Sequence, residues 1–276
     1  MTKPTLERII KNIDSLPPLS DIANLVHELY DSEDEDILKL VKIIESDAVL
    51  AANILKMINS PLYGFSKQVN SITKAVVFLG TQTIYTLVIN YAMKQNLKAD
   101  TEVYAFNSTQ FNEMCQLQSS LVMQWYGKVN LKDARLLSSL ALMMESGKLV
   151  LAMEVSKSAY ADIFRKSFIE CENIQEFEKE LIDSTSYQIS AFLFKHWNLD
   201  PLYIDILHAL DYKEHFDTSL STYVAIIEIV RTTINLREIL TDQSIANASV
   251  LVKNLDLDVD QFKEIAYEIR DNYLNM

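Results

Sequence analysis

Apolar residues recur at helical spacing through the first third of the chain. The spacing i, i+3, i+4, i+7 occurs three times: in Leu6, Ile9, Ile10 and Ile13; in Ile22, Leu25, Val26 and Leu29; and in Ile37, Leu40, Val41 and Ile44. Each set forms one apolar stripe of an amphipathic helix. Thr5, Ser20 and Asp36 precede the three stripes and are residue types that cap helix N-termini. The pattern therefore predicts three consecutive amphipathic helices.

Two more helices are predicted between Asp47 and Gly80. Asp47 can cap the first of them. Asn59-Ser60-Pro61 ends it, because proline lacks an N–H and restricts the residue before it. Ser71 can cap the second helix, and Gly80 closes it where a left-handed residue is usually needed.

The break from Asn59 to Gly64 is predicted to hold the junction of these two helices. Asn59 and Ser60 can bond free backbone groups there. Tyr63 is expected to be largely buried with its hydroxyl partnered, and Gly64 provides backbone freedom. We interpret the break as structural.

The helical pattern continues to the end of the chain. The polar stretch from Lys98 to Glu102 suggests a boundary between residues 1–100 and residues 101–276. Further helices are expected at 107–126, 133–147, 157–171, 174–184, 186–197, 200–213, 219–238 and 259–274, with a short one near 245–255. No segment alternates with period two. The prediction is an all-α, multi-helix bundle in two lobes.

The charge balance argues against a protein that binds nucleic acid. The 276 residues include 25 Lys and Arg against 38 Asp and Glu, which gives a formal net charge of −13. Phosphate backbones need a basic face, and the basic residues here are scattered. Helices on either side of Gly80 are similar to a helix-turn-helix, but Thr81 to Met93 contains no Lys or Arg. We expect no nucleic-acid partner.

A membrane location is also disfavoured. Ala75 to Met93 has no charge over 19 residues, near the length that spans a bilayer. Gly80 lies inside this stretch, so we interpret it as two buried helices that meet at a turn. Cys115 and Cys171 could pair, but no N-terminal apolar signal precedes Lys11. We expect two free thiols in a reducing cytoplasm.

Four pieces of the first lobe resemble the HDOD domain, the HD-related output domain of bacterial signalling proteins. They are Leu16-Pro17-Pro18-Leu19, Glu45-Ser46-Asp47, Asn59-Ser60-Pro61-Leu62-Tyr63-Gly64 and Ile72-Thr73-Lys74-Ala75-Val76-Val77-Phe78-Leu79-Gly80. The resemblance is strong over residues 12 to 97 and weaker from about 105 to 215. The motif residues are Pro17, Asp47, Asn59, Ser60, Pro61, Tyr63, Gly64, Gly80 and, in the second lobe, Gly147.

The second lobe resembles HD-superfamily phosphohydrolases. Their metal site uses an isolated His, a His-Asp pair and a later Asp, because imidazole and carboxylate suit a divalent ion that activates water. The segment from Gly147 to Leu151 resembles the GKLVL that follows the pair, which places the pair on Met144-Glu145. Methionine cannot replace an imidazole for a hard metal.

The other metal-ligand positions also lack imidazole. Trp197 and Leu199 resemble the family's W-x-L-P, although the proline is shifted one place. Counting from Trp197 places the remaining ligands on Ser186 and near Leu210-Asp211. The resemblance therefore implies a degenerate HD-like lobe with no metal and no cofactor.

The chain has four histidines: His27, His196, His208 and His215. His27 is expected on the solvent side of its helix, and His196 is expected to bond locally beside Trp197. Asp205, His208, Asp211 and His215 share roughly one helical face. A metal cluster is one interpretation of that face, and a solvated polar face is the preferred one.

The preferred hypothesis is a non-enzymatic bacterial signalling module that binds other signalling proteins in the cytoplasm. One alternative is a divergent metal-dependent phosphohydrolase with relocated ligands. Another is a sensor of a small molecule or nucleotide that uses the cleft between the lobes. Neither the partner nor the oligomeric state can be read from the residues.

Overall fold

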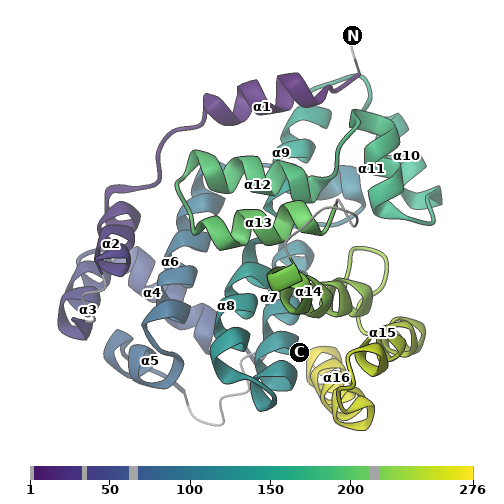
Figure 1. The fold of residues 1–276 in the computed structure, drawn as a ribbon. Helices are drawn as coiled ribbons and strands as arrows, with labels where there is room; N and C mark the ends of the chain where they lie inside the picture. The colour runs from purple at the N-terminus through teal and green to yellow at the C-terminus, as the bar shows by residue number, and fades with distance from the viewer. Residues whose placement is uncertain (1–2, 33–35, 62–67, 212–217, 276) are drawn as a thin grey trace.

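The computed structural model describes residues 3–32, 36–61, 68–211 and 218–275 (Figure 1). Helices make up the fold, and the described residues contain no strand, only an isolated bridge between Ile234 and Ile239. The predicted all-α bundle is confirmed.

The first lobe contains the helices that the apolar stripes predict. They are α1 (Leu6–Asp14), α2 (Asp21–Asp31), α3 (Ile37–Glu45), α4 (Ala48–Ile58), α5 (Ile72–Leu79) and α6 (Thr81–Asn96). The side chains of Thr5, Ser20, Asp36, Asp47 and Ser71 each accept a bond from a backbone N–H in the first turn of the helix that follows. These caps satisfy N–H groups that a helix start leaves without partners.

The second lobe begins with the short 3-10 helix η2 (Thr101–Tyr104). Its long helices are α7 (Ser108–Trp125), α8 (Leu131–Met143), α9 (Ser146–Val155), α10 (Ala161–Glu170), α11 (Ile174–Ile182), α12 (Ser186–His196), α13 (Pro201–Ala209), α14 (Ser221–Thr233), α15 (Asp242–Asn254) and α16 (Val259–Leu274). Short 3-10 turns, η3 (Tyr126–Lys128) and η4 (Thr218–Leu220), lie before α8 and α14.

Two predicted boundaries in the second lobe are wrong. The helix expected to end at Gly147 ends at Met143, and α9, which was not predicted, starts at Ser146 with Gly147 in its first turn. The helix expected to run to Glu238 ends at Thr233. A turn follows it, in which the Asn235 side chain accepts bonds from the backbone of Arg237 and Glu238.

The junction between α4 and α5 depends on Asn59. Its amide donates to the Leu55 carbonyl at 2.8 Å and to the Val69 carbonyl at 2.7 Å, and its oxygen accepts from the Val69 N–H at 2.7 Å. One side chain thus joins the end of α4 to the chain that enters α5. Tyr63 and Gly64 lie outside the described residues.

The α5–α6 pair is sharply bent. The two helices meet at 119°, and Gly80 between them has φ +83°, a conformation that residues with a Cβ rarely adopt. α6 is largely buried. One other stretch, Leu131–Ser156, is long and apolar enough to cross a membrane, and 89% of its apolar window is buried inside the protein. Core packing accounts for the apolar length of α6 and of Leu131–Ser156, whereas Val77 and Phe78 on α5 are exposed.

α1 lies against α9 and α12 of the second lobe (Figure 1). Asn12 donates to Glu154 at 2.6 Å. Farther along, the Trp197 indole donates to the Pro17 carbonyl at 3.0 Å, and a His196 ring nitrogen bonds to the Leu16 carbonyl at 3.1 Å. The expected local bond of His196 is wrong, because its partner is 180 residues away. The division of the chain near residue 100 stays a prediction.

His27 joins α2 to both lobes. Its Nδ1 lies 3.0 Å from the Tyr85 hydroxyl, and its Nε2 lies 3.0 Å from the Asn198 carbonyl. The side chain is 16% exposed. The expectation that it faces solvent is therefore wrong.

Gly147 allows α9 and α12 to pack closely. A Cβ built at this position would lie 1.9 Å from the Ser186 carbonyl oxygen and 2.7 Å from the Ser190 nitrogen. The Gly147 N–H also donates to the Ser190 hydroxyl at 2.8 Å. A side chain there would push the two helices apart.

We predict that Gly147→Ala lowers the free energy of unfolding by about 3 kcal/mol, because backbone atoms cannot yield as side chains do. The matched control is Gly127→Ala, where the nearest atom to an added Cβ is 3.8 Å away. That change should leave stability unchanged or raise it by up to about 1 kcal/mol. Urea unfolding followed by circular dichroism measures both. Equal effects at the two glycines would contradict the close packing.

Candidate functional site

Three charged residues are buried together in the second lobe. Glu145 lies between α8 and α9, Lys148 is in the first turn of α9, and Glu178 is on α11. Their relative exposures are 2%, 4% and 0%. Charged groups are almost never this buried unless they are paired. Each of these three groups therefore requires a bonding partner inside the protein.

The Lys148 ammonium is at the centre of this cluster. Its Nζ lies 2.6 Å from Glu145 Oε2 and 2.8 Å from the Ser186 hydroxyl, and 3.9 Å from Glu178 Oε1. It also lies 4.9 Å from the centre of the Tyr187 ring. The ammonium is therefore held by one direct ion pair, one hydroxyl, a second carboxylate and an aromatic face.

Neutral donors complete the bonding of Glu145. The Gln118 amide on α7 donates to Glu145 Oε1 at 3.0 Å and to the Ile234 carbonyl at 2.9 Å. The Tyr187 hydroxyl donates to the same carboxylate oxygen at 3.2 Å. The reverse orientation of the Gln118 amide would place its oxygen against the Glu145 carboxylate. The orientation in which the amide nitrogen faces Glu145 is therefore favoured.

Glu178 organises the opposite side of the cluster. It accepts from the Ser186 backbone N–H at 2.7 Å and from the Tyr104 hydroxyl at 3.3 Å. Tyr104 is the last residue of η2, two residues after the polar stretch that ends at Glu102, and its side chain is fully buried. This short helix therefore contributes to the site.

The ion pair holds both groups in their charged forms. Burial by itself would raise the pKa of Glu145, but the adjacent Lys148 ammonium and the bonds from Gln118 and Tyr187 outweigh burial and lower it. Burial by itself would lower the pKa of Lys148, but Glu145 and Glu178 outweigh burial and raise it. Each residue is thus the reason that the other stays ionised.

A polar cavity of about 740 Å³ opens beside the cluster. Glu145, Lys148 and Tyr187 line it together with Arg231 from α14. The Arg231 guanidinium lies 5.1 Å from the Tyr187 ring centre and forms an ion pair with Glu228. The buried cluster is therefore the inner wall of a cavity large enough for a small molecule.

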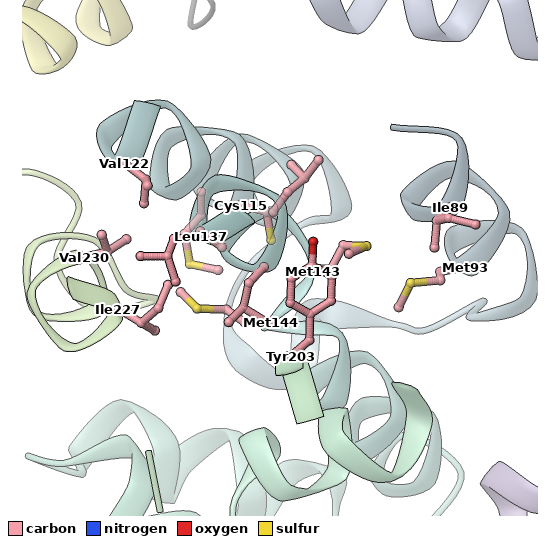
Figure 2. Close-up of a cluster of buried hydrophobic side chains, with 14 of the residues drawn as sticks. Ile89, Met93, Cys115, Val122, Leu137, Met143, Met144, Tyr203, Ile227 and Val230 are labelled. Atoms are coloured by element: carbon pink, nitrogen blue, oxygen red, sulfur yellow. The ribbon is translucent and has the colours of Figure 1, made fainter. Parts of the chain in front are cut away.

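The predicted metal-ligand positions have different environments. Glu145 and Ser186 meet at the Lys148 ammonium. Figure 2 shows Met144 among buried apolar side chains, including Leu137 and Ile227. Leu210 is 2% exposed and belongs to the hydrophobic core. The structure thus brings two of the predicted positions together and leaves two in apolar surroundings.

The second candidate cluster contains no metal site among the described residues. His208 Nδ1 bonds to Gln188 at 2.6 Å, and burial lowers the pKa of His208. Asp211 pairs with Lys179 at 2.9 Å. His215 lies outside the described residues. The thiols of Cys115 and Cys171 are both free, and burial raises the pKa of Cys115 to about 12.

The donors around Glu145 do not fit a divalent metal ion. An HD-type centre combines imidazoles with carboxylates, and the described residues contain no group of three or more His, Cys, Asp or Glu that could hold a metal ion. Of the two carboxylates in the cluster, Glu145 bonds to the Lys148 ammonium at 2.6 Å, and Glu178 accepts from the Ser186 N–H and the Tyr104 hydroxyl. A cation brought next to Lys148 would also be repelled by it.

The family model of the HDOD domain matches residues 16–211, most of the chain. The chain belongs to the HDOD family. No protein of curated function matches it.

Solved structures share the fold. A structure titled "Putative phosphohydrolase" from Shewanella amazonensis SB2B has a TM-score of 0.71 at 20% identity, covering 96% of this chain and 94% of that one. An HDOD domain protein of unknown function from Geobacter sulfurreducens has a TM-score of 0.70 at 16% identity, with 98% and 93% covered. A "Putative signal transduction protein" from Marinobacter aquaeolei VT8 has a TM-score of 0.66 at 21% identity, with 100% and 61% covered. At these identities the likeness shows the fold alone.

Sequence reasoning missed much of the buried cluster. Lys148 lies three residues after Glu145, and this spacing on a helix could have indicated the ion pair. Gln118 and Glu178 are 27 and 33 residues away from Glu145, on helices whose relative placement no local pattern shows. Packing between distant helices brings Gln118 on α7 and Glu178 on α11 into the site beside Lys148 on α9.

We predict that Lys148→Met lowers the free energy of unfolding by about 3–5 kcal/mol at pH 7, because it leaves a buried carboxylate without its cation. Without Lys148, burial raises the folded-state pKa of Glu145 above its unfolded value. The deficit should then shrink as the pH falls from 7 to 5 and Glu145 becomes protonated. In the wild type, Glu145 should affect stability in the opposite direction. Its lowered pKa contributes stability that is lost as the pH falls below the unfolded value of 4.5.

The control for this prediction is Arg270→Met, which removes an ion pair with Asp242, whose side chain is 82% exposed. It should leave the free energy of unfolding nearly unchanged from pH 7 to 5, because an exposed carboxylate stays solvated without its cation. The double change Lys148→Met with Glu145→Gln should recover part of the loss. Urea titrations at three pH values measure these effects. A pH-independent deficit in Lys148→Met would show that Glu145 does not depend on this cation.

Proposed function

We propose that the protein is a non-catalytic regulatory module of bacterial signal transduction that acts in the cytoplasm by contact with other proteins. The observation that carries the proposal is the position of Lys148. Its ammonium lies between Glu145 and Ser186, two of the positions at which the resemblance to HD-type enzymes places metal ligands. An internal cation in this place satisfies the carboxylate that a metal would need.

Substitution of the ligands supports the same conclusion. Met144 belongs to the hydrophobic core, and the Ser186 hydroxyl accepts a bond from Lys148. Neither offers an imidazole to a metal ion. HDOD membership favours a regulatory function, as does one structural neighbour that is named a "Putative signal transduction protein".

An exposed apolar surface is available for a partner. Leu38 on α3, Val49 on α4 and Val77 on α5 are each more than 60% exposed. α3, α4 and α5 pack against one another. A scattered exposed apolar side chain is ordinary, but several on adjacent helices favour a contact surface. The net charge of −13 favours a partner of positive charge by steering its approach.

The purified protein should contain well below one metal ion per chain and should not hydrolyse cyclic dinucleotides or generic phosphoesters in Mn²⁺ or Mg²⁺, because one paired carboxylate cannot hold a hard ion against water. Elemental analysis of protein purified without chelator measures the metal content, and a phosphate-release assay measures hydrolysis. Stoichiometric metal with turnover abolished by Glu145→Ala would contradict the proposal. Turnover that survives Glu145→Ala and disappears in His208→Ala would favour relocated metal ligands.

The protein-contact part of the proposal predicts a specific loss in Val77→Asp. A partner captured from native lysate by the immobilised protein is identified by mass spectrometry, purified and titrated against each variant. Val77→Asp should weaken binding at least about tenfold, because a charge must then be buried in the interface. The control is Val250→Asp on α15, where the valine is 58% exposed. Equal affinity of both variants for the partner would contradict this surface.

A further inference from the structure

The cavity beside the buried cluster is lined mainly by polar and charged side chains. It is bounded by the α10–α11 connection, α12, α14, the turn after α14, and α15, with a volume of about 740 Å³. Pockets for drug-like ligands are mostly apolar with a few polar groups. A cavity of this composition favours a ligand that is itself polar on several sides.

Arg231 supplies a buried donor that the protein leaves without a partner. The residue is 8% exposed and lines the cavity. Its Nη2 side is paired with Glu228, but Nη1 has no hydrogen-bond partner among the described residues. Buried polar groups are nearly always bonded, and an exception needs an explanation. Nη1 is closed to solvent in the free protein, so a ligand oxyanion at this end of the cavity would satisfy it once the Arg231 side chain turns toward the cavity.

A second guanidinium lines the same cavity, as do two carboxylates besides those of Glu145 and Glu228. Arg237 is fixed in place, since its Nη1 donates to the Phe168 and Ile169 carbonyls, each at 3.1 Å. Glu172 and Glu238 also line the cavity and keep solvent exposure. The wall therefore offers guanidinium donors for an anionic group and carboxylate acceptors for N–H donors.

We propose that this cavity binds a small polar molecule that carries both an oxyanion, a carboxylate or a phosphate, and N–H donors. The oxyanion bonds to Arg231, and the N–H groups face Glu172 and Glu238. Such a molecule would be the input of the regulatory module, so this inference rests on the proposed function. The Lys148–Glu145 ion pair forms part of the inner wall of the cavity. The bound molecule is not hydrolysed there.

The test uses the full chain and two sets of probes. One set is the L-amino acids, which combine a carboxylate with an ammonium. The other is the nucleoside monophosphates, which combine a phosphate with the N–H groups of a base. Acetate and inorganic phosphate serve as oxyanions without N–H donors. Isothermal titration calorimetry measures affinity, and thermal unfolding is followed in parallel.

We expect members of one set to bind and to raise the melting temperature by about 5–10 °C at a concentration of 100 times Kd. Acetate and inorganic phosphate should bind at least about tenfold more weakly, because they leave the carboxylates without donors. The set that binds identifies the oxyanion. Failure of every probe to bind with a Kd below about 10 mM would overturn the inference.

Arg231→Lys should weaken binding of the tightest-binding probe at least about tenfold, because lysine keeps the charge but lacks the planar set of donors of a guanidinium. The matched control is Arg270→Lys, since Arg270 also pairs with a carboxylate, Asp242, and lies 4.6 Å from the centre of a tyrosine ring. That control should bind as wild type does. Equal weakening in both variants would overturn the assignment.

Glu172→Gln with Glu238→Gln provides a second test if Arg231→Lys does not fold. These two residues keep solvent exposure, so the change should preserve the melting temperature of the free protein. The double change should weaken binding of the tightest-binding probe several-fold, and unchanged affinity would overturn the placement of the N–H groups.

The outcomes separate this inference from the proposed function. A probe that binds and is then hydrolysed would contradict the proposed function but not the binding site. Absence of binding with intact partner contact would overturn this inference alone.

Discussion

The ion pair between Lys148 and Glu145 is the interaction on which the centre of the second lobe depends. Both groups are almost fully buried, and their charged atoms lie 2.6 Å apart. Removing either one would leave the other charged in a poorly solvated environment, which costs far more than an exposed pair contributes. Gln118, Tyr187 and Ser186 donate to or accept from this pair, so helices α7, α9 and α12 are positioned by the same two charges.

This arrangement places a lysine ammonium between two of the positions at which the family resemblance puts metal ligands. Close packing of α9 on α12 at Gly147 keeps Glu145 near Ser186, as a metal centre would need. The residues at those positions then bind a lysine ammonium in place of a metal ion. A cavity of about 740 Å³ remains open on one side of the pair, with Arg231 in its wall. In the proposed function, this frame recognises a molecule or transmits a contact without a hydrolytic step.

Local sequence signals predicted the first lobe well and the site in part. Apolar spacing and the cap residues carry the information for α1 to α6, because capping bonds form within one turn of the cap. Gly147 was predicted to end a helix, since glycine commonly does so. Its use here is contact with Ser186, 39 residues later, which no local pattern shows. Glu178 and Tyr104 entered the site for the same reason, through packing between distant helices. The resemblance to a known family supplied the positions of Glu145 and Ser186, but not the cation between them.

An anomalous-scattering map from crystals grown in millimolar Mn²⁺ tests directly whether the Lys148 ammonium takes the place of a metal ion. We expect no manganese peak within bonding distance of Glu145, and density for the Lys148 ammonium between Glu145 and the Ser186 hydroxyl. A manganese ion bound to Glu145, with the Lys148 side chain turned away, would contradict this expectation.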